Sequence, residues 1–306
     1  GRRQTALFGM YDRIGIAVDG SDEARRAARR GLQLAQMFDA TATVLSVVER
    51  KALRLTETSA EKTRFRERGE EALADVEELA SELGYPVHTN LTEGKPAVRI
   101  SEYADERGAD LIVVGRQGVT GLGRRLLGGV TERVLHRSDV PVLVVPGGDD
   151  AGTESGYSRV LLTTDGSENA DVATPHGVAI AQRYRSEVHV LNVVDLQTAG
   201  GVFNAGGLER EFVERLDERG REAVDSVADE IANAAAELTV TTAVERTRAY
   251  EGVAPGVREY VEENEIDLVV MGSHGRSGLR RQLLGSVAST VLRTVDVPVL
   301  VVKRPG

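Results

Sequence analysis

Short apolar runs alternate with longer stretches of helical periodicity along the whole chain. In the first half the runs, rich in Val, Ile and Leu, are Ile14–Val18, Thr43–Val48, Val87–Leu91, Leu111–Val114 and Val142–Val145. The stretches between them predict helices over Asp22–Phe38, Ala60–Leu83, Ala97–Arg107 and Val130–His136. Nearly continuous apolar strands are typical of a parallel sheet that helices cover on both faces. With right-handed crossovers, this order predicts a doubly wound α/β domain of five strands.

The same pattern occurs twice along the chain. The matching segments are Arg13–Gln36 with Arg159–Gln182, Thr43–Glu49 with His189–Asp195, Asp110–Gly115 with Asp267–Gly272, and Asp139–Val145 with Asp296–Val302. Recurrence at this scale predicts two tandem domains, residues 1–148 and 157–306. Residues 149–156, rich in Gly, Asp and Ser, form the predicted linker. The second half also carries extra residues, most of them near 197–207.

A glycine pattern follows the fourth apolar run in both halves. The run ends on a glycine, a second glycine follows closely, and a third stands just before or at the start of the last predicted helix. These glycines are Gly115, Gly118 and Gly128 in the first half, and Gly272, Gly275 and Gly285 in the second. A glycine at the strand end lets a ligand lie against bare backbone. The amides and dipole of the helix that follows attract an anion, so the pattern predicts an anion site in each half.

The residue after the third glycine differs between the halves. The second half has Ser286, whose hydroxyl is suited both to capping the helix and to bonding a phosphate, whereas the first half has Gly129. The glycine loops also hold Arg124 and Arg281, candidate charge partners for a polyphosphate.

Two other loops are expected to meet the glycine loop, because ligands of an open parallel sheet bind beyond the carboxyl ends of the strands at the switch point. The first strand is followed by Asp-Gly-Ser, beginning at Asp19 or Asp165, and the second strand ends near Val47 or Val193. An aspartate there suits a ribose hydroxyl or an adenine amine. Asp-Gly-Ser before a helix is also a common capped turn, so both roles stay open.

Composition and missing motifs exclude several classes of protein. An apolar content of 41% and a charged content of 28% are those of a soluble globular protein, and the net charge of −10 argues against nucleic-acid binding. The chain has no cysteine, no apolar run long enough to span a bilayer and no signal-peptide pattern, so we expect a cytoplasmic protein without membrane partners. It has no Walker lysine, no metal-ligand spacing among its histidines and no converging nucleophile and base. We therefore expect no catalytic residues, no metal-ligating residues and no enzyme activity.

The repeated pattern resembles a tandem universal stress protein, with one copy of that domain over Tyr11–Pro146 and another over Tyr157–Lys303. The ATP-binding subclass of that family carries G-x2-G-x9-G followed by Ser or Thr. The second half matches this motif fully, and the first half departs from it at Gly129. The resemblance implies a Rossmann-like fold of the adenine-nucleotide alpha hydrolase type.

The resemblance also implies the ligand contacts: an aspartate on adenine or ribose, strand-end backbone on adenine, and glycine loops around the phosphates. The implied residues are Asp19, Val47, Val114, Gly115, Gly118, Gly128 and Gly129 in the first half, and Asp165, Val193, Met271, Gly272, Gly275, Gly285 and Ser286 in the second. The leading hypothesis is a stress-response regulatory protein that holds ATP, AMP or ADP with little or no hydrolysis. The alternatives are a slow ATPase or phosphotransferase that would use Mg²⁺, and an assembly module with degenerate pockets.

The last strands of the two halves predict how the halves associate. Val142–Val145 and Val299–Val302 are wholly apolar and would otherwise present raw sheet edges. Antiparallel pairing between them would make an internal pseudo-dimer, and two chains could also form a homodimer.

Overall fold

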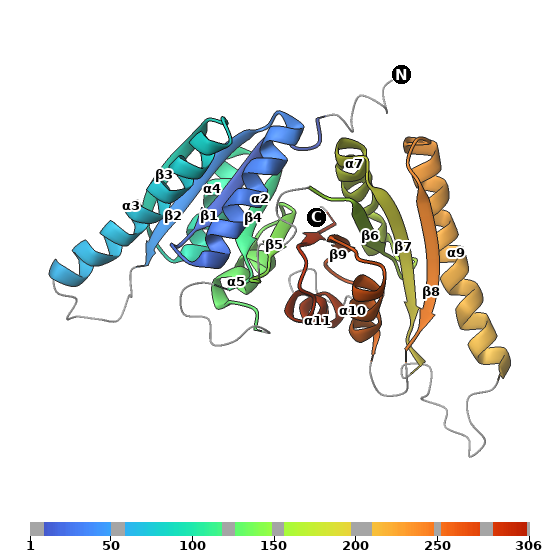
Figure 1. Ribbon diagram of the computed structural model, residues 1–306. Coiled ribbons are helices and arrows are strands. Elements are labelled where there is room, and N and C mark those ends of the chain that lie inside the picture. Colours follow the sequence, from blue (N-terminus) through green and yellow to red (C-terminus); the bar gives the residue numbers. More distant parts are fainter. Residues whose placement is uncertain are drawn as a thin grey trace, which may run out of the picture. The chain divides into compact units, whose positions relative to one another are not determined.

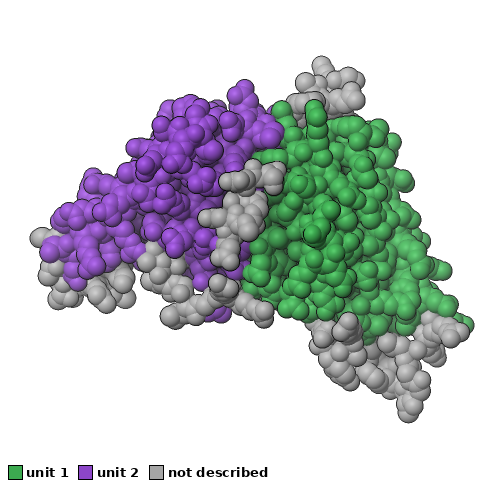
Figure 2. Space-filling view, viewed as in Figure 1, with its two compact units in different colours: residues 1–7, 155–306 green, residues 8–154 purple. Residues whose placement is uncertain are grey.

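The computed structural model describes residues 9–49, 59–117, 126–148, 156–196, 210–247, 252–275 and 284–304. The chain divides into two compact units, shown in different colours in Figure 2. The N-terminal unit comprises residues 8–154 (purple), and the C-terminal unit comprises residues 155–306 (green). None of the described helices is long and apolar enough to cross a membrane.

Strands and helices alternate along the N-terminal unit (Figure 1). Its strands are β1 (Arg13–Val18), β2 (Thr41–Glu49), β3 (Val87–Gly94), β4 (Leu111–Gly115) and β5 (Val142–Val145). Its helices are α2 (Asp22–Phe38), α3 (Ser59–Glu82), α4 (Pro96–Arg107) and α5 (Gly129–Arg137). The strand order is β3-β2-β1-β4-β5, and the pairs are parallel. The direction of winding reverses between β1 and β4, which sets the switch point at their carboxyl ends.

The C-terminal unit repeats this topology with the order β8-β7-β6-β9-β10 and parallel pairs. Its strands are β6 (Arg159–Thr163), β7 (Glu187–Val194), β8 (Val240–Arg246), β9 (Leu268–Gly272) and β10 (Val299–Val302). Its helices are α6 (Glu168–Asp171), α7 (Thr174–Tyr184), α9 (Arg210–Ala234), α10 (Val253–Glu263) and α11 (Ser286–Thr294). The predicted fold class, two tandem doubly wound domains of five parallel strands, is confirmed.

The first helix differs between the units. In the N-terminal unit α2 runs unbroken over Asp22–Phe38, as predicted. In the C-terminal unit the matching segment divides into α6, which ends at Asp171, and α7, which has Pro175 in its first turn. Proline lacks an N–H donor, and its ring clashes with the carbonyl four residues earlier, here that of Asp171. The helix therefore stops at Asp171 and starts again at Thr174.

The core of each unit lies on the faces of its central strands. Leu111, Ile112 and Val113 of β4 are at most 1% exposed, and β9 is buried along its whole length. Buried Val, Ile and Leu side chains on consecutive residues show that both faces of the sheet are covered, as a parallel sheet requires. The outer strands β3 and β8 are half-buried or exposed.

Mid-helix glycines bring one helix of each unit close to the sheet. A Cβ at Gly69 of α3 would lie 2.7 Å from Leu91 Cδ1, and a Cβ at Gly220 of α9 would lie 2.7 Å from Asn192 Oδ1. Glycine at both positions leaves room for these side chains, so each long helix packs closely against the second and third strands of its sheet.

Two predictions concern the association of the units rather than their folds. The pairing of Val142–Val145 with Val299–Val302 and the homodimer of chains both stay predictions. The same holds for the domain boundaries at 148 and 157.

Candidate functional site

A cavity of about 390 Å³ lies at the carboxyl ends of the strands in the C-terminal unit. It is lined by the ends of β6, β7 and β9 and by the start of α11. Every residue predicted for a ligand in the second half contributes to this lining: Asp165, Val193, Met271, Gly272, Gly275, Gly285 and Ser286. The volume is within the range of small-molecule sites, roughly 300–1,000 Å³.

Asp165 reaches the glycine loop while it also shapes its own turn. Its Oδ1 accepts hydrogen bonds from the backbone N and the Oγ of Ser167, at 3.0 and 2.5 Å. Its Oδ2 would lie 2.6 Å from a Cβ at Gly275. Asp165 therefore stabilises its own turn, which is one of the two roles left open by the sequence, and it also places a carboxylate oxygen against the loop. Its contact with a ligand stays a prediction.

The ends of the glycine loop are held to the sheet by backbone hydrogen bonds. Ser273 N donates to Val302 O at 2.8 Å, and Gly285 N donates to Ser273 O at 2.8 Å. A Cβ at Gly272 would lie 2.1 Å from Asn169 O, so glycine is required where the strand ends. These contacts fix the entry and exit of the loop before any ligand binds.

The start of α11 corrects one predicted role of Ser286. The N-cap residue is Gly285, and no described side chain makes a capping hydrogen bond there. Ser286 is instead the first residue of the helix, exposed at the cavity, and its carbonyl accepts a hydrogen bond from Thr290 Oγ1 at 2.9 Å. The predicted capping role is wrong, because a residue with helical dihedrals lies one position too late to be the N-cap.

The cavity has walls that the sequence prediction missed. Helix α9 contributes Leu216 and Arg219, and α10 contributes Val257. Asn192 of β7 also lines the cavity and donates from Nδ2 to Thr164 O at 2.8 Å. A sequence signal for the α9 wall does exist, since E-R-G-x-E-A occurs at residues 67–72 and again at 218–223.

The N-terminal unit holds the two ends of its own glycine loop with matching backbone hydrogen bonds. Arg116 N donates to Val145 O at 2.7 Å, and Gly128 N donates to Arg116 O at 2.8 Å. A Cβ at Gly115 would lie 3.1 Å from the backbone carbon of Glu23, so this glycine also sits against the start of the first helix. The path of the backbone at both loop ends is therefore shared between the units.

The other residues predicted in the first half lie around this loop. Asp19 Oδ1 accepts a hydrogen bond from Ser21 N at 3.0 Å. Val47 lies near the end of β2 and Val114 near the end of β4, and both of these strands pair with β1. Gly128 is the N-cap of α5, and Gly129 is its first residue. Gly118, Arg124 and Arg281 lie outside the described residues, as do residues 197–207.

An arginine approaches the first residue of α5. A Cβ at Gly129 would lie 3.3 Å from Arg133 Nη2, so a guanidinium stands beside the position that corresponds to Ser286. The matching residue of the second half is Thr290. The side chain of Arg116, in contrast, is only 1% exposed.

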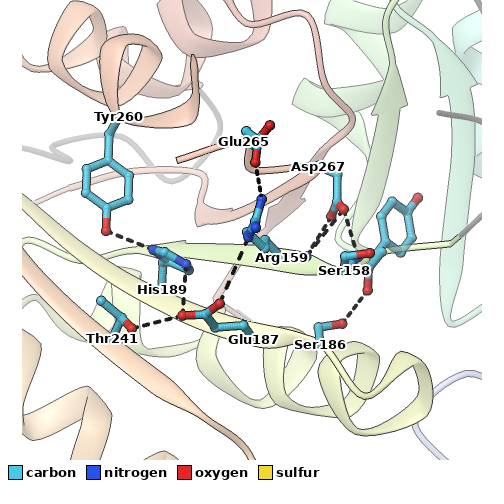
Figure 3. Close-up of polar contacts among 10 residues, drawn as sticks. Ser158, Arg159, Ser186, Glu187, His189, Thr241, Tyr260, Glu265 and Asp267 are labelled. Atoms are coloured by element: carbon cyan, nitrogen blue, oxygen red, sulfur yellow. Dashed lines mark hydrogen bonds and ion pairs between the residues drawn. The ribbon is translucent and has the colours of Figure 1, made fainter. Parts of the chain in front are cut away.

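A separate polar cluster lies at the amino ends of β6 and β7, outside the cavity lining (Figure 3). His189 Nδ1 is 2.9 Å from Tyr260 Oη, and its Nε2 is 3.5 Å from Glu187 Oε1. Arg159 joins the cluster through Glu187, with its Nε 4.0 Å from Oε2, and its Nη1 donates to Glu265 Oε2 at 2.8 Å. Burial lowers the pKa of His189, an effect that Glu187 opposes and Arg159 reinforces. This end of the sheet faces away from the site, and its contacts hold strand ends together.

Two further observations bear on chemistry. Burial lowers the pKa of His176 to about 4, so this histidine is neutral at pH 7. In the described parts of the chain, no group of three or more His, Cys, Asp or Glu residues is arranged to hold a metal ion.

The fold and the cavity define a class: tandem doubly wound α/β proteins with a cavity at the switch point. The model of the universal stress protein family matches residues 10–146 and 156–303, and the chain therefore belongs to that family, with two copies of its domain.

Similar proteins cover the chain in two ways. A universal stress protein of Mycolicibacterium smegmatis is 30% identical over 302 residues, covering 94% of this chain and 96% of that protein. One from Methanocaldococcus jannaschii is 42% identical over 140 residues, covering 44% of this chain and 82% of that protein. The crystal structure of a universal stress protein from Archaeoglobus fulgidus has the same fold, with a TM-score of 0.70 at 21% identity and 97% of each chain covered.

Proposed function

We propose that this protein is a stress-response regulator that binds an adenine nucleotide, ATP or its relatives AMP and ADP, with little or no hydrolysis. The observation that carries the proposal is the cavity of the C-terminal unit. Four separate segments of the chain bring the residues of the ATP-binding motif, Asp165 and Val193 to its lining. The resemblance of the motif to the ATP-binding subclass supports an adenine nucleotide as the occupant.

The two sides of the cavity suit the two ends of a nucleotide. Val193, Val257 and Met271 give apolar surface for a flat base, and Asp165 accepts hydrogen bonds from a ribose hydroxyl or an adenine amine. Gly275 and the first turn of α11, which follows Gly285, offer backbone amides to phosphate oxygens. Arg219 adds a cation that pairs with phosphate.

A divalent cation would find carboxylates in the same cavity. Asp165 and Asp195 both line it, and Mg²⁺ in nucleotide sites is commonly held by one or two carboxylates together with phosphate oxygens. These residues fit Mg²⁺ as a companion of the phosphates, where it would neutralise phosphate charge.

Slow turnover follows from what the lining offers. In-line attack on a phosphate needs a positioned water and charge compensation at the leaving oxygen. The loop residues that line the cavity contribute mainly backbone amides, and Oδ1 of Asp165 is already bound to Ser167, which leaves Oδ2 for the ligand or its cation. The bound nucleotide would thus act as a signal, altering a surface that a partner reads.

The test is direct binding to the full chain. We expect an adenine nucleotide among the small molecules released on denaturation, and calorimetric binding that Asp165→Ala weakens at least about tenfold, since a charge-assisted hydrogen bond is lost. The control is Asp229→Ala, which removes an exposed acid of α9 outside the cavity lining. Absence of binding by wild-type protein would refute the proposal and favour an assembly module.

Hydrolysis is measured on the same protein with Mg²⁺ present. We expect phosphate release slower than about one turnover per minute, because the loop residues that line the cavity contribute mainly backbone amides. Faster release that Gly275→Asp abolishes would establish a slow ATPase or phosphotransferase instead. A cytoplasmic location, where adenine nucleotides are abundant, fits this function and is checked by cell fractionation.

A further inference from the structure

Two buried polar side chains lie next to each other in the wall of the C-terminal cavity. Thr164 directly follows β6, and Asn192 belongs to β7. Both residues line the cavity, and each is only 8% exposed. A polar group is costly to bury unless a hydrogen-bonding partner meets it. The groups that these two side chains present to the cavity therefore limit which ligands fit it.

A backbone carbonyl fixes the orientation of the Asn192 amide. Its Nδ2 donates to Thr164 O at 2.8 Å, and because a carbonyl oxygen only accepts, the nitrogen of the amide lies on this side. The Oδ1 on the other side is an acceptor, and no described residue donates to it. A Cβ at Gly220 would lie 2.7 Å from this oxygen, and Gly220 also lines the cavity. The amide thus presents an acceptor at the cavity wall.

The hydroxyl of Thr164 supplies a donor beside that acceptor. Its Oγ1 accepts a hydrogen bond from Gly166 N at 3.0 Å, so the proton of the hydroxyl is left for a second partner. The carbonyl of the same residue holds Asn192, which keeps the two groups adjacent. The cavity wall therefore offers one donor and one acceptor side by side.

The N-terminal unit does not carry this pair. Val18 stands at the place of Thr164, and Ser46 stands at the place of Asn192. Both side chains are buried, but an apolar side chain and a single hydroxyl do not present the same donor and acceptor. The pair belongs to the C-terminal unit and not to the scaffold that the two units share.

A donor beside an acceptor matches one edge of adenine. The exocyclic amine of adenine donates, and the ring nitrogen beside it accepts, whereas guanine and hypoxanthine carry an exocyclic oxygen beside a ring N–H. A base of the second kind would set its oxygen against Asn192 Oδ1. Two acceptors would then face each other, and a buried polar group would stay unpaired.

We propose that Asn192 and Thr164 select the base of the nucleotide in the C-terminal cavity. The proposal rests on the proposed function, adenine-nucleotide binding. The base lies beside Val193, which follows Asn192 in β7, and Asp165, which follows Thr164, holds the ribose. Asn192 Oδ1 accepts from the exocyclic amine, and Thr164 Oγ1 donates to the ring nitrogen. The cavity therefore takes adenine nucleotides in preference to those of guanine and hypoxanthine.

The experiment compares ATP with inosine triphosphate, in which an oxygen replaces the exocyclic amine. Both are titrated calorimetrically into the full chain in an Asp19→Ala background, which removes a predicted ligand contact of the N-terminal unit. We expect ATP to bind at least about tenfold more tightly, and Asn192→Leu to bring this ratio close to one, because the acceptor that distinguishes the bases is lost. The matched control is Asn264→Leu, which removes an amide that donates to Tyr260 O outside the cavity lining and leaves the ratio unchanged.

A second variant tests the donor. Thr164→Val introduces the residue of the N-terminal unit and removes only the hydroxyl. It should lower the affinity for ATP about tenfold more than the affinity for an analogue in which carbon replaces the accepting ring nitrogen. The control is Thr241→Val, the same exchange at an exposed position of β8. Thr164→Val also decides the question if Asn192→Leu does not fold, as judged by circular dichroism.

The outcomes separate the two proposals. If the wild-type chain binds no adenine nucleotide, the proposed function fails and this inference fails with it. If it binds ATP and inosine triphosphate equally well, only the inference is overturned. Equal losses of the two ligands in Asn192→Leu would also overturn it, because Asn192 would then only support the cavity wall. A change in the preference for ATP over deoxy-ATP in Asn192→Leu would overturn it too, since the acceptor would then bind the ribose.

Discussion

The two glycine loops start and end alike, yet they present different groups to a ligand. In both units the residue after the strand-end glycine is bound to the last strand, and the third glycine is bound back to that residue, at 2.7–2.8 Å. The N-terminal loop then faces Glu23 and Arg133. The C-terminal loop faces Asn169 and the exposed Ser286.

The comparison distinguishes the backbone scaffold that the two units share from the side chains that could give them different ligand preferences. The shared features are the backbone hydrogen bonds that hold the two ends of each glycine loop. They form in both units because the strand order and the first and third glycines of the motif are the same. The groups that face the loops are side chains near the amino ends of neighbouring helices. They can change without disturbing the sheet, because each occupies an edge of the core rather than its centre.

The largest expected effect comes from replacing the glycine that ends β4 or β9, because the nearest backbone atoms lie at different distances in the two units. Gly272→Ala places a Cβ 2.1 Å from Asn169 O, whereas Gly115→Ala meets backbone at 3.1 Å. We expect Gly272→Ala to lower the free energy of unfolding by about 3 kcal/mol and Gly115→Ala by about 1 kcal/mol, because a backbone clash needs a larger shift of the chain. Denaturant unfolding measures both. Equal losses would show that α6 moves as readily as α2.

The next effect contrasts the pH dependence of the units. Burial lowers the pKa of His176 to about 4 and also lowers that of His189, whereas the matching residues of the N-terminal unit are Arg30 and Thr43. Unfolded histidine titrates near its ordinary value of about 6.5, so unfolding takes up protons below that pH. Stability is fully present above about pH 6.5 and falls as the pH drops toward 4, by about 2–3 kcal/mol for His176.

Denaturant unfolding of wild-type protein and His176→Gln between pH 7.5 and 4 checks this dependence. We expect a flatter profile for His176→Gln. The control is His88→Gln, which replaces an exposed histidine of β3 and should leave the wild-type profile unchanged. Identical profiles for wild type and His176→Gln would contradict the assignment.

A smaller effect compares the first residues of α5 and α11. Ser286→Gly should weaken ATP binding at the C-terminal site about tenfold, because a hydroxyl that bonds a charged phosphate is lost. Gly129→Ser should strengthen binding at the N-terminal site by less, since its Cβ would lie 3.3 Å from Arg133 Nη2. Titration of ATP into each variant gives both values. A clearly tighter N-terminal site in wild-type protein would overturn the argument from Ser286.

The smallest effect concerns Arg133 itself. Replacing it with the residue of the C-terminal unit, Arg133→Thr, should lower AMP affinity at the N-terminal site about threefold, because an exposed cation contributes up to about 1 kcal/mol. Raised salt should shrink the difference, since exposed charges are screened. Arg137→Thr, at the other end of α5, is the control and should change nothing.

The sequence was sufficient to predict the fold, because the hydrophobic pattern and the glycine motif are clear and each occurs in both halves. Helix α2 begins and ends where the pattern predicts, since Ser21 caps it and Asp39 adopts the left-handed conformation that ends it. The break between α6 and α7 was missed, although Pro175 is visible in the sequence.

The structure brings the residues predicted in the second half together in one cavity, but the sequence prediction missed part of the wall of that cavity. All predicted residues of that half line one cavity, because each follows or ends a strand and parallel strands bring their carboxyl ends together. Arg219 and Leu216 were missed, since nothing in a helical charge pattern tells which side chains face a pocket. The sequence signal for this wall was Gly220, the mid-helix glycine next to Arg219.

The sequence alone determined the alternation of strands and helices, the tandem repeat and the loops that form the site, because hydrophobic periodicity and glycine spacing are local properties of the chain. Only the tertiary structure decided which side chains meet those loops. Glu23 lies 94 residues before Gln117 in the chain, and Gly147 approaches it from a third segment. Contacts between such distant residues depend on helix position and on distances of a few tenths of an ångström, which no local pattern encodes.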